Sequence, residues 1–155
     1  VLNGHPAKVL WLTGCSGSGK STIADAVERK LHSLGIRSFV LDGDNLRSGL
    51  NKDLGFTPED RAENVRRVAE VSRLMYDAGL VAIVALVSPF RADREAARAL
   101  FDDGEFLEAW VDTPIEVAME REEPPPRRRH ERRADHHPRP TPQRSERPPP
   151  HRTHS

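Results

Sequence analysis

Four short apolar runs, each bounded by turn or polar residues, are the most regular feature of the chain. They cover residues 9–13, 38–41, 81–87 and 106–111. A run of this length that is apolar almost throughout, rather than alternating with polar residues, is typical of a β-strand buried on both faces. The sequence therefore predicts four buried strands.

Helical patterns fill the intervals between these runs. Residues 21–34 place apolar side chains on one stripe of a helix, consisting of Ile23, Val27, Leu31 and Leu34. A second helix is predicted over residues 57–78, a third over about residues 92–101, and a fourth from Thr113 onward. Since strands and helices alternate, we expect an α/β fold in which a parallel sheet lies between two layers of helices.

The end of the chain has a different composition. From Glu123 onward Ala134 is the only apolar residue, and Pro, Arg and His dominate. No core can form from such residues. We therefore expect one folded domain over residues 1–122 and a disordered tail over residues 123–155. The whole chain is formally neutral, but the tail has nine Arg against four acids, so it carries +5 and the first part carries −5.

The cellular location is predicted from what the sequence lacks. With Cys15 as its single cysteine, the chain has no internal disulfide, which fits a reducing compartment. No apolar run approaches the roughly 20 residues of a membrane span, and the N-terminus does not have the layout of a signal peptide. We expect a cytoplasmic protein without a membrane partner. The tail has no aromatic residue on which bases could stack, so a Pro-rich linker is favoured over a nucleic-acid-binding arm.

A Walker A pattern, G-x-x-x-x-G-K-S/T, occupies residues 14–21 between a predicted strand and a predicted helix. Its glycines let backbone N–H groups curl around phosphate oxygens, and the start of the helix adds the positive end of its dipole. Lys20 is suited to reach the outer phosphates, and the hydroxyl of Ser21 is suited to bind Mg²⁺. The residues expected to bind ATP are Gly14, Cys15, Ser16, Gly17, Ser18, Gly19, Lys20, Ser21 and Thr22.

The position of the acidic residues narrows the class of P-loop protein. The guanine-reading motif Asn-Lys-x-Asp is absent, and the third strand runs into Ser88 rather than into the Asp that binds magnesium in most Walker B sites. The best candidates for that carboxylate are Asp42 and Asp44, at the carboxyl end of the second strand, where open α/β sheets bind ligands. Gly43 predicts a tight turn between them. The alternative is a pair of acids in a solvated turn.

The acceptor side of the site is predicted at the start of the second long helix. Arg61 and Asn64 are three residues apart and share a helix face. A guanidinium pairs bidentately with sulfate, phosphate or carboxylate, so the pair suits an anionic acceptor that carries a base, and Phe56 is placed to stack on a purine. The alternative is an ordinary charged helix face with Phe56 as a hydrophobic staple. We interpret Arg66 and Arg67 as surface charges.

Five segments together resemble the adenylylsulfate kinase family: GCSGSGKST, LDGDNLRSGLNKDLGF, RAENVRRV, SPFRADRE and WVDTPIEVAMER. The resemblance covers about residues 6–121 and implies a P-loop NTPase-type fold. It also implies that ATP, with Mg²⁺, phosphorylates the ribose 3′-hydroxyl of adenylyl sulfate to give 3′-phosphoadenylyl sulfate. A sulfate adenylyltransferase, fused or separate, is an implied partner, and a homodimer is an implied assembly.

The resemblance also implies roles for individual residues. Catalytic roles fall on Asp44, Lys20 and Ser88, and metal binding falls on Ser21 and Asp44. Ser88 matches a serine that forms a phosphoserine in the family, but in-line transfer needs only positioning and charge stabilisation, so we interpret it as a hydroxyl that lines the substrate. The residues implied in substrate binding are Asp42, Arg47, Phe56, Arg61, Asn64, Pro89, Phe90 and Arg91.

After Arg121 the resemblance ends. The family continues with Asp-Pro-Lys-Gly-Leu-Tyr, a basic helix, an Asn-Phe-Thr-Gly turn and a final strand, whereas this chain reads EEPPPRRRHERRADHHPRP. We therefore expect a truncated domain without lid or last strand. Our hypothesis is a slip of reading frame, which fails if no frame of the encoding DNA restores Lys-Gly-Leu-Tyr. The alternative functions are a catalytically impaired ATP-binding remnant and another small-metabolite P-loop kinase.

Overall fold

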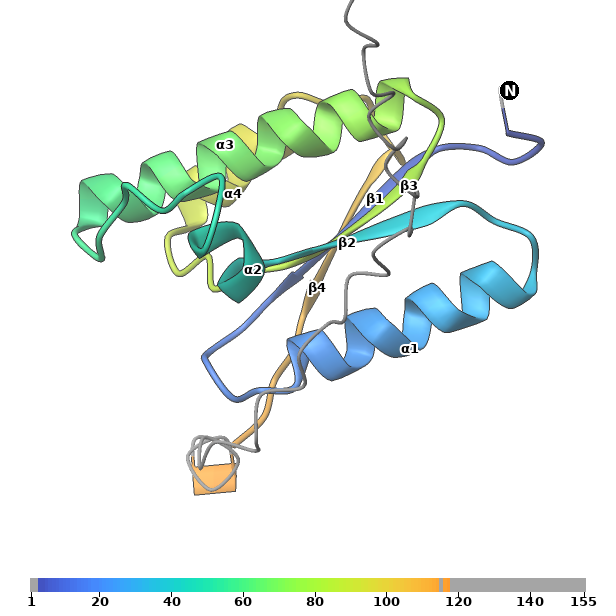
Figure 1. Ribbon diagram of the computed structural model, residues 1–155. Coiled ribbons are helices and arrows are strands. Elements are labelled where there is room, and N and C mark those ends of the chain that lie inside the picture. The colour runs from blue at the N-terminus through green and yellow to red at the C-terminus, as the bar shows by residue number, and fades with distance from the viewer. Residues whose placement is uncertain (1–2, 115, 118–155) are drawn as a thin grey trace, which may run out of the picture. The chain divides into compact units, whose positions relative to one another are not determined.

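The structure is a computed structural model that describes residues 3–114, 116 and 117. Strands and helices alternate along this part of the chain, as the apolar runs predict (Figure 1). The predicted tail, the domain boundary at residue 122 and nearly all of the helix predicted from Thr113 onward lie outside the described residues.

Four parallel strands form one sheet. Its members, in the spatial order β2-β3-β1-β4, are β2 (Ser38–Asp42), β3 (Val81–Ala85), β1 (Lys8–Thr13) and β4 (Phe106–Trp110). Each of the four apolar runs is thereby confirmed as a strand. In the register of the sheet both Leu12 and Asp42 lie opposite Ala85, and Thr13 lies opposite Trp110. The carboxyl ends of the four strands therefore meet at one edge of the sheet.

Helices cover both faces of this sheet. They are α1 (Lys20–Ser33), the short α2 (Gly43–Arg47), α3 (Pro58–Asp77) and α4 (Arg91–Arg98). Figure 1 shows α1 on one side of the sheet and α3 with α4 on the other. Within the described part of the chain, no helix is both long and apolar enough to cross a membrane. The predicted arrangement of a parallel sheet between two helical layers is confirmed.

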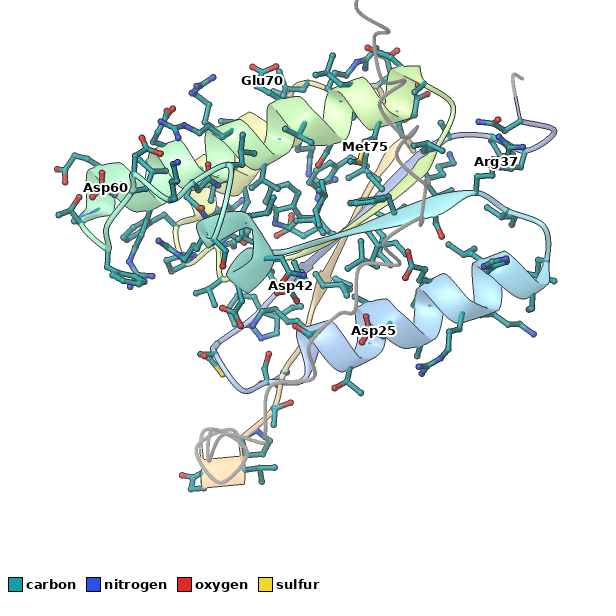
Figure 2. All side chains as sticks on the ribbon, in the orientation of Figure 1. Asp25, Arg37, Asp42, Asp60, Glu70 and Met75 are labelled. Carbon is teal, nitrogen blue, oxygen red and sulfur yellow. The ribbon has the colours of Figure 1, made fainter. Side chains whose placement is uncertain are left out.

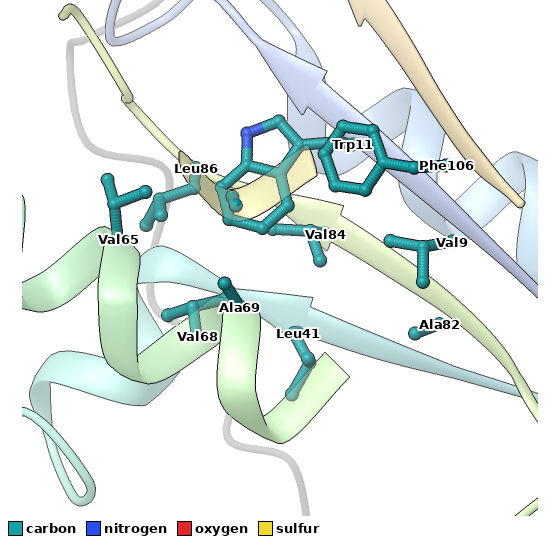
Figure 3. Close-up of a cluster of buried hydrophobic side chains, with 11 residues drawn as sticks. Val9, Trp11, Leu41, Val65, Val68, Ala69, Ala82, Val84, Leu86 and Phe106 are labelled. Atoms are coloured by element: carbon teal, nitrogen blue, oxygen red, sulfur yellow. The ribbon is translucent and has the colours of Figure 1, made fainter. Parts of the chain in front are cut away.

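The larger core lies between the sheet and α3. Trp11 is at its centre, with no exposed surface, and its ring lies 5.6 Å from that of Phe106 between ring centroids. Val65 and Val68 of α3 pack into the same cluster, as Figure 3 shows. A second, smaller cluster, which includes Ala24, lies between the sheet and α1. Burial of apolar side chains on both faces explains why β3 is apolar throughout. The prediction of four buried strands is wrong for the edge strands β2 and β4, because no strand among the described residues covers their outer sides and they expose Phe39, Leu107 and Trp110.

Two predictions of detail are wrong. The third strand ends at Ala85 rather than at residue 87: Leu86 still donates one hydrogen bond to the Leu12 carbonyl (3.1 Å), and then the chain leaves the sheet. Ile23 on α1 and Leu34, the C-cap of that helix, are exposed, at 40 % and 60 %. The side chain that is fully buried there is Ala24, because a small residue lets the helix approach the sheet closely and so turns Ile23 outward.

Candidate active site

The phosphate loop connects the end of β1 to the start of α1. Its glycines are needed where they occur: Gly19 has φ 99°, and a Cβ on Gly14 would lie 2.7 Å from the carbonyl oxygen of Val111. The segment after β4 holds the loop from outside, since the Thr113 hydroxyl donates to the Ser18 carbonyl at 2.7 Å. This contact, which the sequence did not reveal, helps to fix the loop in the shape that phosphate binding requires.

Side chains within the loop differ in their exposure. Ser18 and Lys20 are buried, and Gly14 is buried against Val111, the residue after β4. The exposed residues are Cys15, Ser16, Ser21 and Thr22. The ammonium group of Lys20 donates to the loop's own carbonyls, Cys15 at 2.6 Å and Gly14 at 3.1 Å. Burial lowers the pKa of Lys20 from its ordinary value, and nearby acidic groups, including the carboxylates of Asp42 and Asp44, oppose that shift.

Asp42 ties the second strand to the phosphate loop. Its carboxylate accepts hydrogen bonds from the hydroxyl of Ser21 (2.5 Å) and from the backbone N–H of Asp44 (3.0 Å). The second bond makes Asp42 the N-cap of α2, so the tight turn predicted at Gly43 is wrong and a short helix begins there instead. Figure 2 shows Asp42 beside α2, on the side of the sheet where α1 lies. Asp44 itself is exposed.

Two of the residues predicted on the acceptor side, Arg47 and Arg61, come together at Phe56. Its ring is 68 % exposed, and the guanidinium carbons of Arg47 and Arg61 lie 4.3 Å and 5.7 Å from its centroid. Arg47 also donates to the Gly55 carbonyl at 3.1 Å, and Arg61 donates to the Phe56 carbonyl at 3.0 Å. A hydrophobic staple would need an apolar side chain where Arg61 stands, so the staple alternative does not fit. Two cations and an exposed aromatic ring suit an anion that carries a base.

Asn64 lies deeper than the other predicted acceptor residues. It is only 2 % exposed, and its Oδ1 accepts a hydrogen bond of 2.8 Å from the Nδ2 of Asn51, which has no exposed surface. Asn51 was not among the predicted site residues, because an Asn in a loop is usually a turn former. An ordinary charged helix face does not describe this position, since Asn64 takes part in a buried polar contact between the α2–α3 loop (residues 48–57) and α3.

Arg67 is more than a surface charge, contrary to our interpretation. It pairs with both carboxylate oxygens of Asp53, at 2.7 Å and 2.9 Å, and its Nε donates to Glu63 at 2.8 Å. It also donates to the Leu50 carbonyl at 3.2 Å. Arg66, in contrast, is exposed and contacts acids of its own helix. Arg67 therefore fastens the α2–α3 loop to α3, which could not be foreseen because Asp53 is far from it in the sequence.

We expect the Glu63→Gln variant to lose part of the acid sensitivity of folding. Hydrogen bonds from Arg66 and then Arg67 lower the pKa of Glu63 from 4.5 to about 2. A depressed pKa stabilises the fold above the ordinary value of 4.5, and the stabilisation is lost as the pH falls toward 2. Urea midpoints measured across this range should fall more steeply in the wild type than in Glu63→Gln. Glu70→Gln on the same helix should keep the wild-type slope, and equal slopes in all three proteins would contradict the prediction.

The segment after β3 lies at the same edge of the sheet. Ser88 is 1 % exposed; its hydroxyl accepts from the Nε1 of Trp11 (3.1 Å) and shares a hydrogen bond with the Thr13 hydroxyl (2.8 Å). Its carbonyl accepts from Arg94 at 2.7 Å. The hydroxyl is thus bonded to core side chains, and a role in lining the substrate stays a prediction. The neighbouring Pro89, Phe90 and Arg91 are exposed, and Arg91 pairs with Glu95 at 2.7 Å.

The arrangement as a whole suits a nucleotide and a second anion. The phosphate loop, Asp42, the α2–α3 loop and Ser88 all follow the carboxyl ends of β1, β2 and β3, which the sheet register places side by side. Backbone N–H groups, a buried ammonium and two carboxylates stand on the loop side. Two guanidinium groups and an aromatic ring lie in the chain that follows β2, on the predicted acceptor side. Such a set of groups can hold a polyphosphate and a second, base-bearing anion.

Comparison with known proteins gives a consistent result. The family model for adenylylsulphate kinase matches residues 6–125. The chain is 55 % identical over 121 residues to an adenylyl-sulfate kinase of Erwinia tasmaniensis, which covers 78 % of this chain and 60 % of that protein. It is 62 % identical over 114 residues to the bifunctional enzyme NodQ of Azospirillum brasilense, covering 74 % of this chain and 18 % of that protein. The chain therefore spans only part of the length of either relative.

A solved structure agrees with these relatives. The APS kinase CysC of Mycobacterium tuberculosis, in complex with AMPPNP and APS, matches with a TM-score of 0.72 and 48 % sequence identity. The match covers 76 % of this chain and 69 % of that chain. Together with a family match that extends over most of the sequence and over every predicted site residue, this likeness shows that the chain belongs to the adenylylsulphate kinase family.

Proposed function

We propose that the chain transfers the terminal phosphate of ATP to the ribose 3′-hydroxyl of adenylyl sulfate. The observation that carries the proposal is that the phosphate loop contacts Asp42 at the end of β2, and that the chain which follows β2 carries the cluster of Arg47, Phe56 and Arg61. The family and the complex of the mycobacterial relative with AMPPNP and APS support it. In this reaction the 3′-oxygen forms a bond to the γ-phosphorus, the bond to the β,γ-bridging oxygen breaks, and ADP leaves.

On the donor side, the phosphate loop would bind the ATP phosphates. Its backbone N–H groups and the start of α1 offer positive partial charge, and Lys20 supplies a full one. Lys20 donates to the carbonyls of Gly14 and Cys15 in the loop. Phosphate oxygens would replace these carbonyls as partners of the ammonium group, which places its charge at the phosphate that is transferred.

The groups beside the loop fit a magnesium ion. The hydroxyl of Ser21 and the carboxylate of Asp42 are hard oxygen donors in direct contact with each other, and Asp44 is two residues away. Ser21 and Asp44 were the predicted ligands, and the contact with Ser21 adds Asp42. A bound Mg²⁺ would neutralise charge on the phosphates. For its part, Asp44 is exposed and suited to orient the 3′-hydroxyl and to accept its proton.

On the acceptor side, the ring of Phe56 would stack on the adenine of adenylyl sulfate. The guanidinium groups of Arg47 and Arg61 would pair with its sulfate and phosphate. Both arginines are already held by backbone carbonyls of the α2–α3 loop, so little side-chain entropy is lost when the acceptor binds.

We expect Arg61→Ala to raise the KM for adenylyl sulfate about 10- to 100-fold, because one charge-assisted hydrogen bond to the acceptor is lost. The KM for ATP should stay nearly constant. Initial rates of ADP release, measured against each substrate in turn, give both values. Arg29→Ala, on the exposed part of α1, is the matched control and should behave as wild type. A rise in the KM for ATP instead would remove Arg61 from the acceptor site.

The proposed function is tested by coupled measurement of ADP release from Mg-ATP with and without adenylyl sulfate. We expect turnover that depends on adenylyl sulfate and a product with phosphate on the 3′-oxygen. Transfer to gluconate or a nucleoside monophosphate, with none to adenylyl sulfate, would overturn the assignment in favour of another small-metabolite kinase. Calorimetric binding of ATP without any turnover would identify a nucleotide-binding remnant.

Three further expectations remain proposals. The substrate must come from an enzyme that joins sulfate to the adenylyl group of ATP, so a sulfate adenylyltransferase is the natural partner. We also propose a homodimer and a cytoplasmic location. The mass of the purified chain in solution, measured by light scattering, tests the dimer.

A further inference from the structure

Asn51 is a fully buried amide in the α2–α3 loop. It has no exposed surface, and its Nδ2 donates to the Oδ1 of Asn64 at 2.8 Å. Its backbone N–H donates to the carbonyl of Leu46, also at 2.8 Å. Asn51 thus joins α2 to the second turn of α3, and it does so through the side chain of a predicted acceptor-binding residue.

The surrounding loop holds Asn51 in place. Arg67 pairs with Asp53 at 2.7 Å, and the backbone N–H of Gly55 donates to the carboxylate of Asp60 at 2.9 Å. Figure 2 shows Asp60 at the amino end of α3. The loop is thus fastened to α3 on the C-terminal side of Asn51 and to α2 by its own backbone, and both attachments hold the amide of Asn51 beside Asn64.

The direction of the bond between the two amides matters for a ligand. An amide side chain has an oxygen that accepts hydrogen bonds and an NH2 group that donates them. The NH2 group of Asn51 occupies the oxygen of Asn64. This bond holds the oxygen end of the Asn64 amide toward Asn51, so the NH2 group, a donor, is the end that points away from Asn51.

The remaining polar atom of Asn51 does not explain why an amide occupies this position. Its Oδ1 is buried without a hydrogen-bond partner among the residues that the structure describes. A buried acceptor without a partner is destabilising, and an apolar side chain of the same size would avoid that cost. The NH2 end of Asn51, which directs Asn64, is the part of the amide that is used.

We propose that Asn51 is a positioning residue that fixes the amide of Asn64 with its NH2 group toward the acceptor nucleotide. The inference rests on the proposed function, in which Asn64 binds adenylyl sulfate. It adds a residue to that site and a chemical requirement: the group that meets Asn64 is a hydrogen-bond acceptor, as a purine ring nitrogen or a ribose oxygen is. A reversed amide would present an oxygen to that group and repel it.

The Asn51→Asp variant tests this directly. It keeps the size and shape of the side chain but replaces the NH2 donor with an acceptor, so the amide of Asn64 must turn to donate to it. We expect the KM for adenylyl sulfate to rise about tenfold, the equivalent of one lost hydrogen bond. The kcat and the KM for ATP should stay nearly constant. Asn3→Asp, which makes the same chemical change in the segment before β1, should leave all three values unchanged.

Two further variants separate positioning from a general effect on the fold. Asn64→Asp keeps the bond from Asn51 but presents an oxygen to the ligand, so its KM for adenylyl sulfate should rise as in Asn51→Asp. In an Asn64→Ala background, Asn51→Asp should have no further effect. An undiminished rise in that background, or an Asn64→Asp variant with wild-type KM, would overturn the inference.

Calorimetric titration with adenylyl sulfate distinguishes this inference from the proposed function. Wild-type protein that binds ATP but not adenylyl sulfate would overturn the proposed function, and the inference with it. Wild-type protein that binds adenylyl sulfate, with Asn51→Asp binding it equally tightly, would overturn the inference alone. Thermal unfolding of each variant shows whether a weaker affinity reflects loss of the folded state.

Discussion

Asp44→Asn should lower the kcat for phosphate transfer about 10²- to 10⁴-fold, the range that one proton-accepting group contributes. The side chain keeps its size, but the amide cannot take the proton of the 3′-hydroxyl and binds a cation poorly. ATP should still bind, because the backbone of the phosphate loop and Lys20 are unchanged. Single-turnover rates with saturating Mg-ATP and adenylyl sulfate measure the fall in the rate of phosphate transfer. Calorimetric titration with ATP measures the affinity for ATP that the variant retains.

The matched control is Asp103→Asn. Asp103 is also exposed, but it precedes β4 and so lies at the opposite end of the sheet. Asp42 would be a poor control, because its carboxylate caps α2 and contacts Ser21, and its replacement would disturb the fold as well as the site. Wild-type kcat in Asp44→Asn would contradict the role of Asp44. An equal loss in Asp103→Asn would mean that the effect does not come from the site.

Trp11→Ala should destabilise the fold by about 3–5 kcal/mol. Trp11 has no exposed surface, and its removal leaves a cavity between the sheet and α3 (Figure 3). It also deprives the buried hydroxyl of Ser88 of the donor at 3.1 Å. Since the free energy of unfolding of a small domain is only about 5–15 kcal/mol, a loss of this size would leave many of the variant molecules unfolded under mild conditions. The free energy of unfolding is obtained from urea denaturation followed by circular dichroism.

Two other variants sharpen this measurement. Leu107→Ala removes an apolar side chain from β4 that is 51 % exposed, and it should cost much less than the change in the core. Trp11→Phe keeps an aromatic ring but removes the indole N–H, so it should lie between wild type and Trp11→Ala. Equal stability of Trp11→Ala and Leu107→Ala would show that Trp11 is not central to the core.

The parts of the fold that could be predicted are those with a local signal. Each strand is a run of apolar residues that needs no knowledge of its neighbours. Helix α3 begins at Pro58, directly after Thr57, whose side chain caps it, and Thr followed by Pro is itself a local signal for the start of a helix. The phosphate loop was recognisable because its glycines and its lysine occur at fixed spacing between a strand and a helix. From these elements alone the edge of the sheet that carries the site could be inferred.

The contacts that could not be predicted join residues far apart in the sequence. Asn51 reaches Asn64, Arg67 reaches Asp53, and Thr113 reaches the carbonyl of Ser18. The short helix α2 was missed because five residues are too few for a periodic pattern, and Gly43 is a poor helix former. Exposure of Ile23 depended on how closely α1 approaches the sheet, which is a property of the packed molecule rather than of the helix.

Because of the strand order, the donor side and the proposed acceptor side of the site are built from different connections, which can vary in sequence to different degrees. The chain leaves β1 toward the face covered by α1, but it leaves the adjacent β3 toward the face covered by α4, so β1 and β3 flank a topological switch point. Donor binding depends on the backbone of the β1–α1 connection. The groups proposed for the acceptor come mainly from the connections that follow β2 and β3. Those connections can change in length and side chains while the phosphate loop stays the same, so one nucleotide-binding frame can serve many acceptors.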